Sequence, residues 1–188
     1  MRTAGERPMR ADARRNYKRL LDEAKAAFLE HGAEAPLEDI ARRAGVGIGT
    51  LYRHFPTRLA LQAAVYQDQV DELCARAYAL LDSEPPGTAL AAWMSSFADY
   101  ATSKRGLMQT LKEVIDVRSD LFDRCHDEIR EAATAVLVPA QEAGTVRPEV
   151  TVSDLLRLTH GLSVATQNAP ETAERLLSYL LDGLRPPR

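Results

Sequence analysis

Apolar residues recur along most of the chain at spacings of three and four, which is the period of an α-helix. Over residues 12–31 the apolar positions are Tyr17, Leu20, Leu21, Ala24, Ala27 and Phe28. The sustained alternation of apolar and polar residues that marks a half-buried strand is missing, and β-branched residues are thinly spread. This pattern predicts an all-α protein.

Glycine and proline divide the pattern into helices. Gly32 is expected to end the first helix, and Gly45 to end a short second helix that Pro36 opens. A third short helix runs to Phe55, before Pro56. Further helices are expected at 57–81, 88–102, 104–116, 119–142, 152–167 and 170–184. We therefore expect a three-helix head over residues 1–56 and a body of about six helices over residues 57–188.

The two short helices of the head, joined by a glycine-containing turn, are typical of a helix-turn-helix, whose second helix enters the major groove of DNA. Three glycines at alternate positions need a reason, because an interior glycine costs up to about 1 kcal/mol relative to alanine. We expect Gly45 to end the helix, Gly47 to form the turn, and Gly49 to let the backbone approach DNA. The alternative is that the glycines only shape the turn.

Helical geometry predicts which side of the second short helix faces outward. At about 100° per residue, and with Leu51 pointing inward, Phe55 and Ile48 fall on the inner half. The outward set is then Gly49, Thr50, Tyr52 and Arg53.

The charge is unevenly distributed. The net charge of the 188 residues is −3, yet residues 1–60 carry 12 Lys and Arg against 8 Asp and Glu. A basic end on an acidic body is typical of a protein whose one end meets a polyanion. Arg14 and Arg15 could reach phosphates or the minor groove, and Arg43 a phosphate; a solvated, mobile N-terminus explains the first two equally well.

The stretch LEDIARRAGVGIGTLYRHFPTRLALQAAV resembles the DNA-binding domain of the TetR family of bacterial transcriptional repressors, over roughly residues 10–65. The resemblance implies a homodimer with DNA-binding heads and helical bodies that bind a small ligand. It also implies contacts of Thr50 and Tyr52 with bases or phosphates, of His54 and Arg58 with the DNA backbone, and a groove-side position for Gly47, Ile48 and Gly49. The chain departs from the family pattern where Gly47 replaces a common serine, Pro36 a common threonine cap, and Arg58 a common lysine.

The body offers candidates for a pocket that would take a small apolar or amphipathic ligand, with ordinary core packing as the alternative for each residue. The candidate apolar walls and the two histidines that would add polarity come from the middle and later helices: Trp93, Met94, Phe97, Tyr100, Met108, Leu111, Phe122, Cys125, His126, Ile129 and His160.

The last two expected helices carry more leucine than one core face requires, which predicts a dimer interface in the form of a four-helix bundle. The candidates are Leu155, Leu158, Leu162, Leu177, Leu180, Leu181 and Leu184. A wholly internal core is the competing interpretation.

The sequence gives little support to an enzyme, a metalloprotein or a membrane protein. Cys125 and His126 are adjacent, so on a helix they point about 100° apart and do not face one another as a nucleophile and its base would. No nucleophile elbow, phosphate loop or metal-ligand spacing occurs. We therefore expect no enzyme, no cofactor and no metal. Two unpaired cysteines and the lack of an apolar run of about 18 residues predict a cytoplasmic protein that does not cross a membrane.

The hypothesis is a repressor that binds a pseudo-palindromic operator as a homodimer and is released by a small molecule. A DNA-binding regulator that responds to a protein partner, or that activates transcription without a small ligand, would have the same head and stays open.

Overall fold

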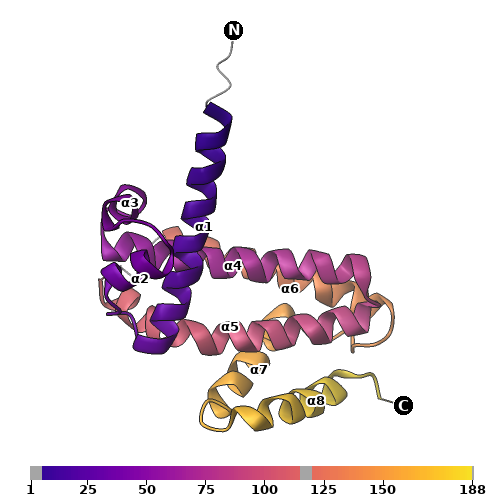
Figure 1. The fold of residues 1–188 in the computed structure, drawn as a ribbon. Helices are drawn as coiled ribbons and strands as arrows, with labels where there is room; N and C mark the ends of the chain where they lie inside the picture. The colour runs from indigo at the N-terminus through magenta and orange to yellow at the C-terminus, as the bar shows by residue number, and fades with distance from the viewer. Residues whose placement is uncertain (1–5, 115–119, 188) are drawn as a thin grey trace. The chain divides into compact units, whose positions relative to one another are not determined.

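The computed structural model of the protein describes the backbone of residues 6–114 and 120–187, and the side chains of residues 12–103 and 120–187. Within these ranges every regular element is a helix, which confirms the predicted fold class. In chain order the elements are α1 (Glu6–His31), α2 (Leu37–Arg43), α3 (Ile48–His54), α4 (Arg58–Ser83), α5 (Pro86–Val114), α6 (Asp120–Glu142), α7 (Val152–Ala165), the 3₁₀ helix η1 (Pro170–Thr172) and α8 (Ala173–Leu184) (Figure 1).

The helices differ from the expected ones in three places. α1 begins before residue 12, since Pro8 falls in its first turn, where proline is tolerated. The helices expected at 88–102 and 104–116 are a single helix, α5, because a long helix absorbs the modest cost of one interior glycine at Gly106. The last expected helix is divided into η1 and α8. Of the helices described, none combines the length and the apolar character needed to span a bilayer.

The chain forms two compact units, which are described separately. The head unit contains the chain up to Asp68 and a segment of α5 that begins at Gly106. The body unit contains residues 69–105 and, of the later chain, the described residues from 120 on. The two units therefore divide within α4, whereas the sequence places the boundary ahead of that helix, at residues 56 and 57.

The core of the head takes one large apolar residue from each of its four main helices. Leu20 of α1, Ile40 of α2, Leu51 of α3 and Leu61 of α4 are all 0% exposed. Burying each of these side chains stabilises the fold by about 1.5–3 kcal/mol. Because α2 and α3 have only seven residues each, this shared core, and not helix propensity, keeps them folded.

The body unit is held together by a buried tryptophan and by a chain of helix contacts. Trp93 of α5 is fully buried, stacks on Phe97 at a centroid distance of 5.6 Å, and donates its indole N–H to the carbonyl oxygen of Leu73 in α4 at 3.1 Å. α7 contacts α6 on one side and α8 on the other (Figure 1). α7 begins with a capping box, in which Thr151 and Asp154 bond each other's backbone N–H groups.

Candidate nucleic-acid interface

Glycine makes the turn between α2 and α3 possible. Gly45 has a φ of +66°, in the left-handed region, and its N–H donates to the carbonyl oxygen of Arg42 at 3.1 Å, which closes α2. Gly47 is the N-cap of α3 and has extended backbone angles, with no side chain to cap the helix. Gly49 lies inside α3, where an added Cβ would meet no described atom within 4 Å. The prediction that Gly45 ends a helix is confirmed, and the space beside Gly49 is open.

The exposed side of α3 follows the predicted outward set, with one difference. Gly49 and Arg53 are exposed, Tyr52 is 45% exposed, and Thr50 is half-buried. Ile48, expected on the inner half, is 37% exposed. Ile48 is the first residue of α3, so its side chain lies where the helix leaves the turn and not over the core that Leu51 fills.

Aromatic contacts fix the C-terminal end of α3 against α1. Tyr17 of α1 lies 5.2 Å from the ring of Phe55 and 5.8 Å, edge to face, from the ring of His54. Phe55 is buried and His54 is half-buried. The predicted phosphate contact of His54 stays a prediction, and the structure gives the ring a second use in orienting α3.

The cations of the head differ in whether an acidic partner already neutralises them. Within the described part of the chain, Arg53 of α3 and Arg14 of α1 have no hydrogen-bond or ion-pair partner, and both are exposed. Arg15 is bound to Asp12, one turn earlier on α1. Arg53 and Arg14 are therefore the candidates from the predicted set with an uncompensated charge to offer a phosphate.

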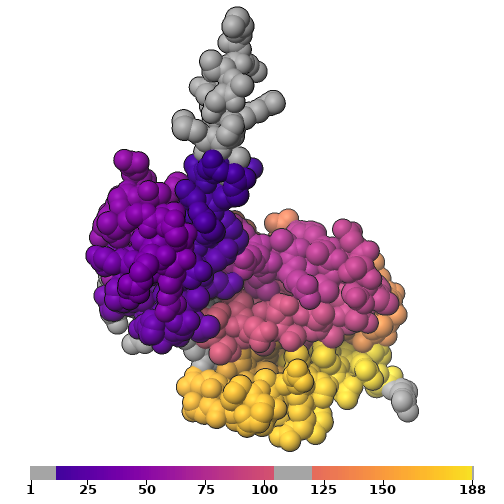
Figure 2. Space-filling model, in the orientation of Figure 1, coloured from indigo at the N-terminus to yellow at the C-terminus, as the bar shows by residue number. Residues whose placement is uncertain are grey.

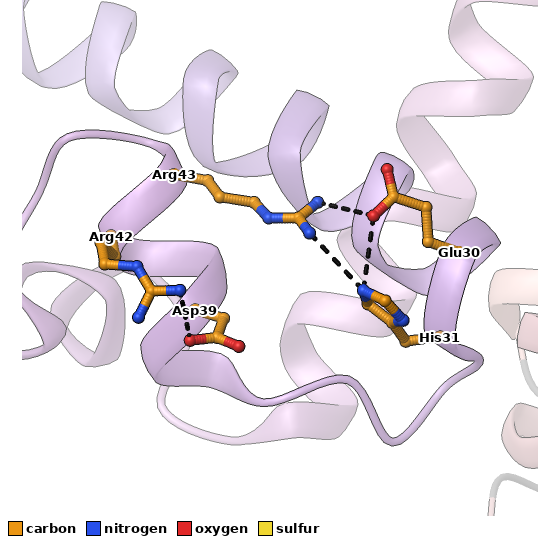
Figure 3. Close-up of polar contacts among 5 residues, drawn as sticks. All are labelled: Glu30, His31, Asp39, Arg42 and Arg43. Atoms are coloured by element: carbon orange, nitrogen blue, oxygen red, sulfur yellow. Dashed lines mark hydrogen bonds and ion pairs between the residues drawn. The ribbon is translucent and has the colours of Figure 1, made fainter.

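Arg42 and Arg43 at the end of α2 are both paired (Figure 3). Arg42 lies 2.9 Å from Asp39. Arg43 donates to Glu30 at 2.9 Å and lies 3.5 Å from the imidazole of His31. The hydrogen bond to Glu30, reinforced by its charge, raises the pKa of Arg43 above its usual value. Arg43 would have to leave Glu30 to bind a phosphate.

Arg58, which the family resemblance assigns to the DNA backbone, is used inside the head. One of its terminal nitrogens, Nη1, donates to the carbonyl oxygen of Ala33 at 3.1 Å and to that of Ala35 at 2.6 Å. Its side chain is 30% exposed. Sequence spacing gives no sign of these bonds, because they join residues more than twenty positions apart.

Arg19 is a basic residue at the turn that the sequence did not single out. A Cβ added to Gly45 would lie 3.8 Å from Nη1 of Arg19, so the guanidinium lies against the α2–α3 turn. Its hydrogen bond goes to the neutral side chain of Asn16. Its position in the sequence could have indicated it, because Arg19 follows the candidate Arg15 by one helical turn and so lies on the same side of α1.

The ligand-pocket candidates divide by burial. Seven of them are buried in the body, where they form part of its core: Trp93, Met94, Phe97, Tyr100, Phe122, Cys125 and Ile129. His126 and His160 are exposed. Met108 and Leu111 belong to the residues whose side chains the structure leaves undescribed. The proposed pocket therefore stays a prediction.

The dimer candidates lie on α7 and α8, which form a continuous part of the surface of the body (Figure 2). Leu155, Leu177 and Leu184 are buried within the chain, while Leu162, Leu180 and Leu181 are half-buried. Leu158 is 46% exposed, and Val164 and Tyr179 add further exposed apolar surface on the same two helices. The leucines thus serve both the chain's own core and its surface.

The helix-turn-helix head with a helical body defines a class of DNA-binding regulators, and comparison with known proteins identifies the family. The model of the bacterial regulatory proteins of the tetR family matches residues 20–65, and that of the C-terminal domain of SbtR-like transcriptional regulators matches residues 85–186. The TetR regulator SCO0520 of Streptomyces coelicolor is 40% identical, with a TM-score of 0.83, over 91% of this chain and 99% of that one. A TetR regulatory protein of Mycobacterium vanbaalenii is 37% identical, with a TM-score of 0.79, over 95% of this chain and all of that one.

The chain belongs to the TetR family of bacterial transcriptional regulators. It is accordingly a DNA-binding regulator and not an enzyme. Among curated proteins, the HTH-type transcriptional regulator SAR0097 of Staphylococcus aureus is 37% identical over 71 residues. That match spans 36% of this chain and 37% of the relative, so it covers little more than a third of either protein.

Proposed function

We propose that the protein is a repressor that binds a pseudo-palindromic operator as a homodimer and leaves it when a small molecule binds the body. DNA binding by this protein is supported mainly by the exposed side chains on the outer side of α3. There Tyr52 and Arg53 are exposed, and Arg53 has no ion-pair or hydrogen-bond partner among the described residues, while Leu51 holds the helix to the core of the head. Such a helix suits the major groove, where a guanidinium and a hydroxyl can bond base edges or phosphates.

The α7–α8 surface supports the homodimer. Leu158, Val164 and Tyr179 are 46%, 49% and 63% exposed, and exposed apolar side chains on two neighbouring helices are the kind of surface that a second copy could cover. In a homodimer, each protomer would offer one α3 to one of two successive major grooves, whose centres lie about 34–36 Å apart along DNA.

Release by a ligand is supported by α4, which contributes residues to both compact units. A molecule that binds better to a conformation with the wrong spacing of the two α3 helices would shift the population away from DNA. The ligand class we propose is small and apolar or amphipathic, because the middle helices of the body contribute mainly apolar side chains. A regulator of DNA acts in the cytoplasm, and we propose that location.

The experiment is selection of binding sites from random DNA, followed by anisotropy titration with a panel of metabolites. Selected sites with inverted half-sites, and a metabolite that lowers affinity, would support the whole proposal. Inverted half-sites with no active metabolite would favour control by a protein partner. A reporter in cells distinguishes repression from activation, which depends on where the operator lies.

A further inference from the structure

Two side chains of α4 hold the loop that precedes the helix-turn-helix. Arg58 donates from Nη1 to the carbonyl oxygens of Ala33 and Ala35, and Gln62 donates from Nε2 to that of Ala33 at 2.9 Å. Arg58 and Gln62 are four residues apart, so they lie on the same side of α4. The first two turns of α4 are thereby attached to the α1–α2 loop by three hydrogen bonds.

The bonds from α4 are side-chain contacts to the loop that leads into α2, and α2 has no side-chain cap at its own start. Pro36 is the N-cap residue and makes no side-chain cap bond, since proline has neither a hydroxyl nor an N–H. Ala33 and Ala35 are buried, at 7% and 2% exposed. Buried carbonyl oxygens require donors, and Arg58 and Gln62 supply them. Side chains of α4 therefore help to hold the loop from which α2 starts.

We propose that Arg58 and Gln62 are positioning residues for DNA binding: by holding the carbonyls of Ala33 and Ala35 they fix α2, and through α2 the recognition helix α3. In this account Arg58 affects DNA affinity through the loop and does not bind a phosphate. If the guanidinium moved away to a phosphate, the carbonyl of Ala35 would lose the donor that Nη1 of Arg58 supplies, and that of Ala33 would keep only Gln62. The inference rests on the proposed DNA binding by α3.

The two roles of Arg58 predict different salt dependence. Each phosphate that a cation neutralises adds about 0.9 to the slope of log affinity against log salt concentration. A positioning residue lowers the affinity at every salt concentration by a similar factor and leaves the slope unchanged. Gln62 is neutral and 2% exposed, so an effect of Gln62 on DNA binding does not come from a phosphate contact of its own.

The test measures the affinity for a selected operator by fluorescence anisotropy at salt concentrations between about 50 and 300 mM, a range over which the loss of affinity reports the number of phosphate contacts. The variants are Arg58→Gln, Arg58→Lys and Gln62→Leu. Arg53→Gln serves as the comparison for loss of an exposed cation. Gln69→Leu is the matched control, because Gln69 is a second buried glutamine of α4, whose Oε1 has no hydrogen-bond partner among the described residues.

We expect Arg58→Gln and Gln62→Leu each to weaken binding about tenfold with slopes parallel to the unmodified protein, while Gln69→Leu binds normally. Arg58→Lys should also weaken binding at an unchanged slope, because it keeps the charge and loses the guanidinium fork. Amide exchange at Ala35 and Ile40, the first bonded amides of the loop and of α2, should accelerate in the weakened variants under conditions where urea curves show them folded.

Three results would overturn the proposal: a slope lower by about one unit in Arg58→Gln, normal affinity in Arg58→Lys, or normal affinity in Gln62→Leu. If Arg58→Gln does not fold, Arg58→Lys and Gln62→Leu decide the question by themselves. Failure of the unmodified protein to select any DNA would instead refute the proposed function and is read separately.

Discussion

Gly49 provides a test of the DNA-facing side of α3 that separates folding from binding. The perturbation is Gly49→Ala, which adds one methyl group to the second residue of that helix. The added Cβ meets no described atom within 4 Å, and Gly49 is not among the glycines with positive φ. Alanine in place of glycine stabilises a helix by about 0.5–1 kcal/mol. We expect the lower end of this range, since Gly49 lies in the first turn.

The effect on DNA binding should have the opposite sign. If the backbone of α3 at Gly49 lies against DNA, the methyl group enters a close contact. Forcing an extra methyl group into a packed contact costs about 1–3 kcal/mol, which corresponds to roughly 5- to 150-fold weaker binding. Urea unfolding followed by circular dichroism gives the stability, and fluorescence anisotropy on a selected operator gives the affinity.

Gly45→Ala supplies the contrast, because the left-handed backbone of Gly45 penalises any Cβ by about 1–2 kcal/mol. It should lower the stability, whereas Gly49→Ala should raise it. A Gly49→Ala protein that is more stable and binds DNA normally would show that this face does not approach DNA closely. A less stable Gly49→Ala protein would contradict the description of the α3 backbone.

Three further outcomes are expected. Gly47→Ser should stabilise the protein by a few tenths of a kcal/mol in urea unfolding, because serine caps a helix better than glycine; a loss of stability would show that the N-cap geometry is different. Leu158→Glu should convert the dimer to a monomer in light scattering, while Val138→Glu, at a similarly exposed position of α6, should not; equal behaviour of the two would exclude the α7–α8 interface. Burial, reinforced by nearby carboxylates such as Glu128, raises the pKa of the Cys74 thiol to about 11. Because the folded state then holds this proton more tightly than the unfolded chain, stability should fall as the pH rises from about 9 to 11, and Cys74→Ser should remove that part of the fall.

Local rules predicted the head well. The end of α1 before Gly32, the end of α2 before Gly45 and the outward positions of Gly49, Tyr52 and Arg53 follow from chain chemistry and helical period. The rule that glycine ends a helix failed in α5, where the free-energy cost of keeping a glycine inside the helix is small. Gly106 does not interrupt α5, because one glycine inside a helix costs only about 1 kcal/mol relative to alanine.

The partner that each arginine side chain binds could not be predicted from the sequence. Arg43, Arg53 and Arg58 are alike in the sequence, yet Arg43 is paired with Glu30, Arg58 with two loop carbonyls, and Arg53 with nothing described. Which partner an arginine finds depends on contacts between helices, and spacing within one helix does not determine these. The family resemblance gave the position of Arg58 but not the bonds it makes.

Whether α3 of a two-fold dimer reads DNA is tested most directly by one titration. The protein is titrated at several salt concentrations onto its selected operator and onto a variant of that operator with one half-site scrambled. We predict a steep loss of affinity with salt, of about 0.9 in slope per phosphate contacted, and a large loss on the scrambled DNA. A flat salt response, or equal affinity for intact and scrambled operators, would contradict the account.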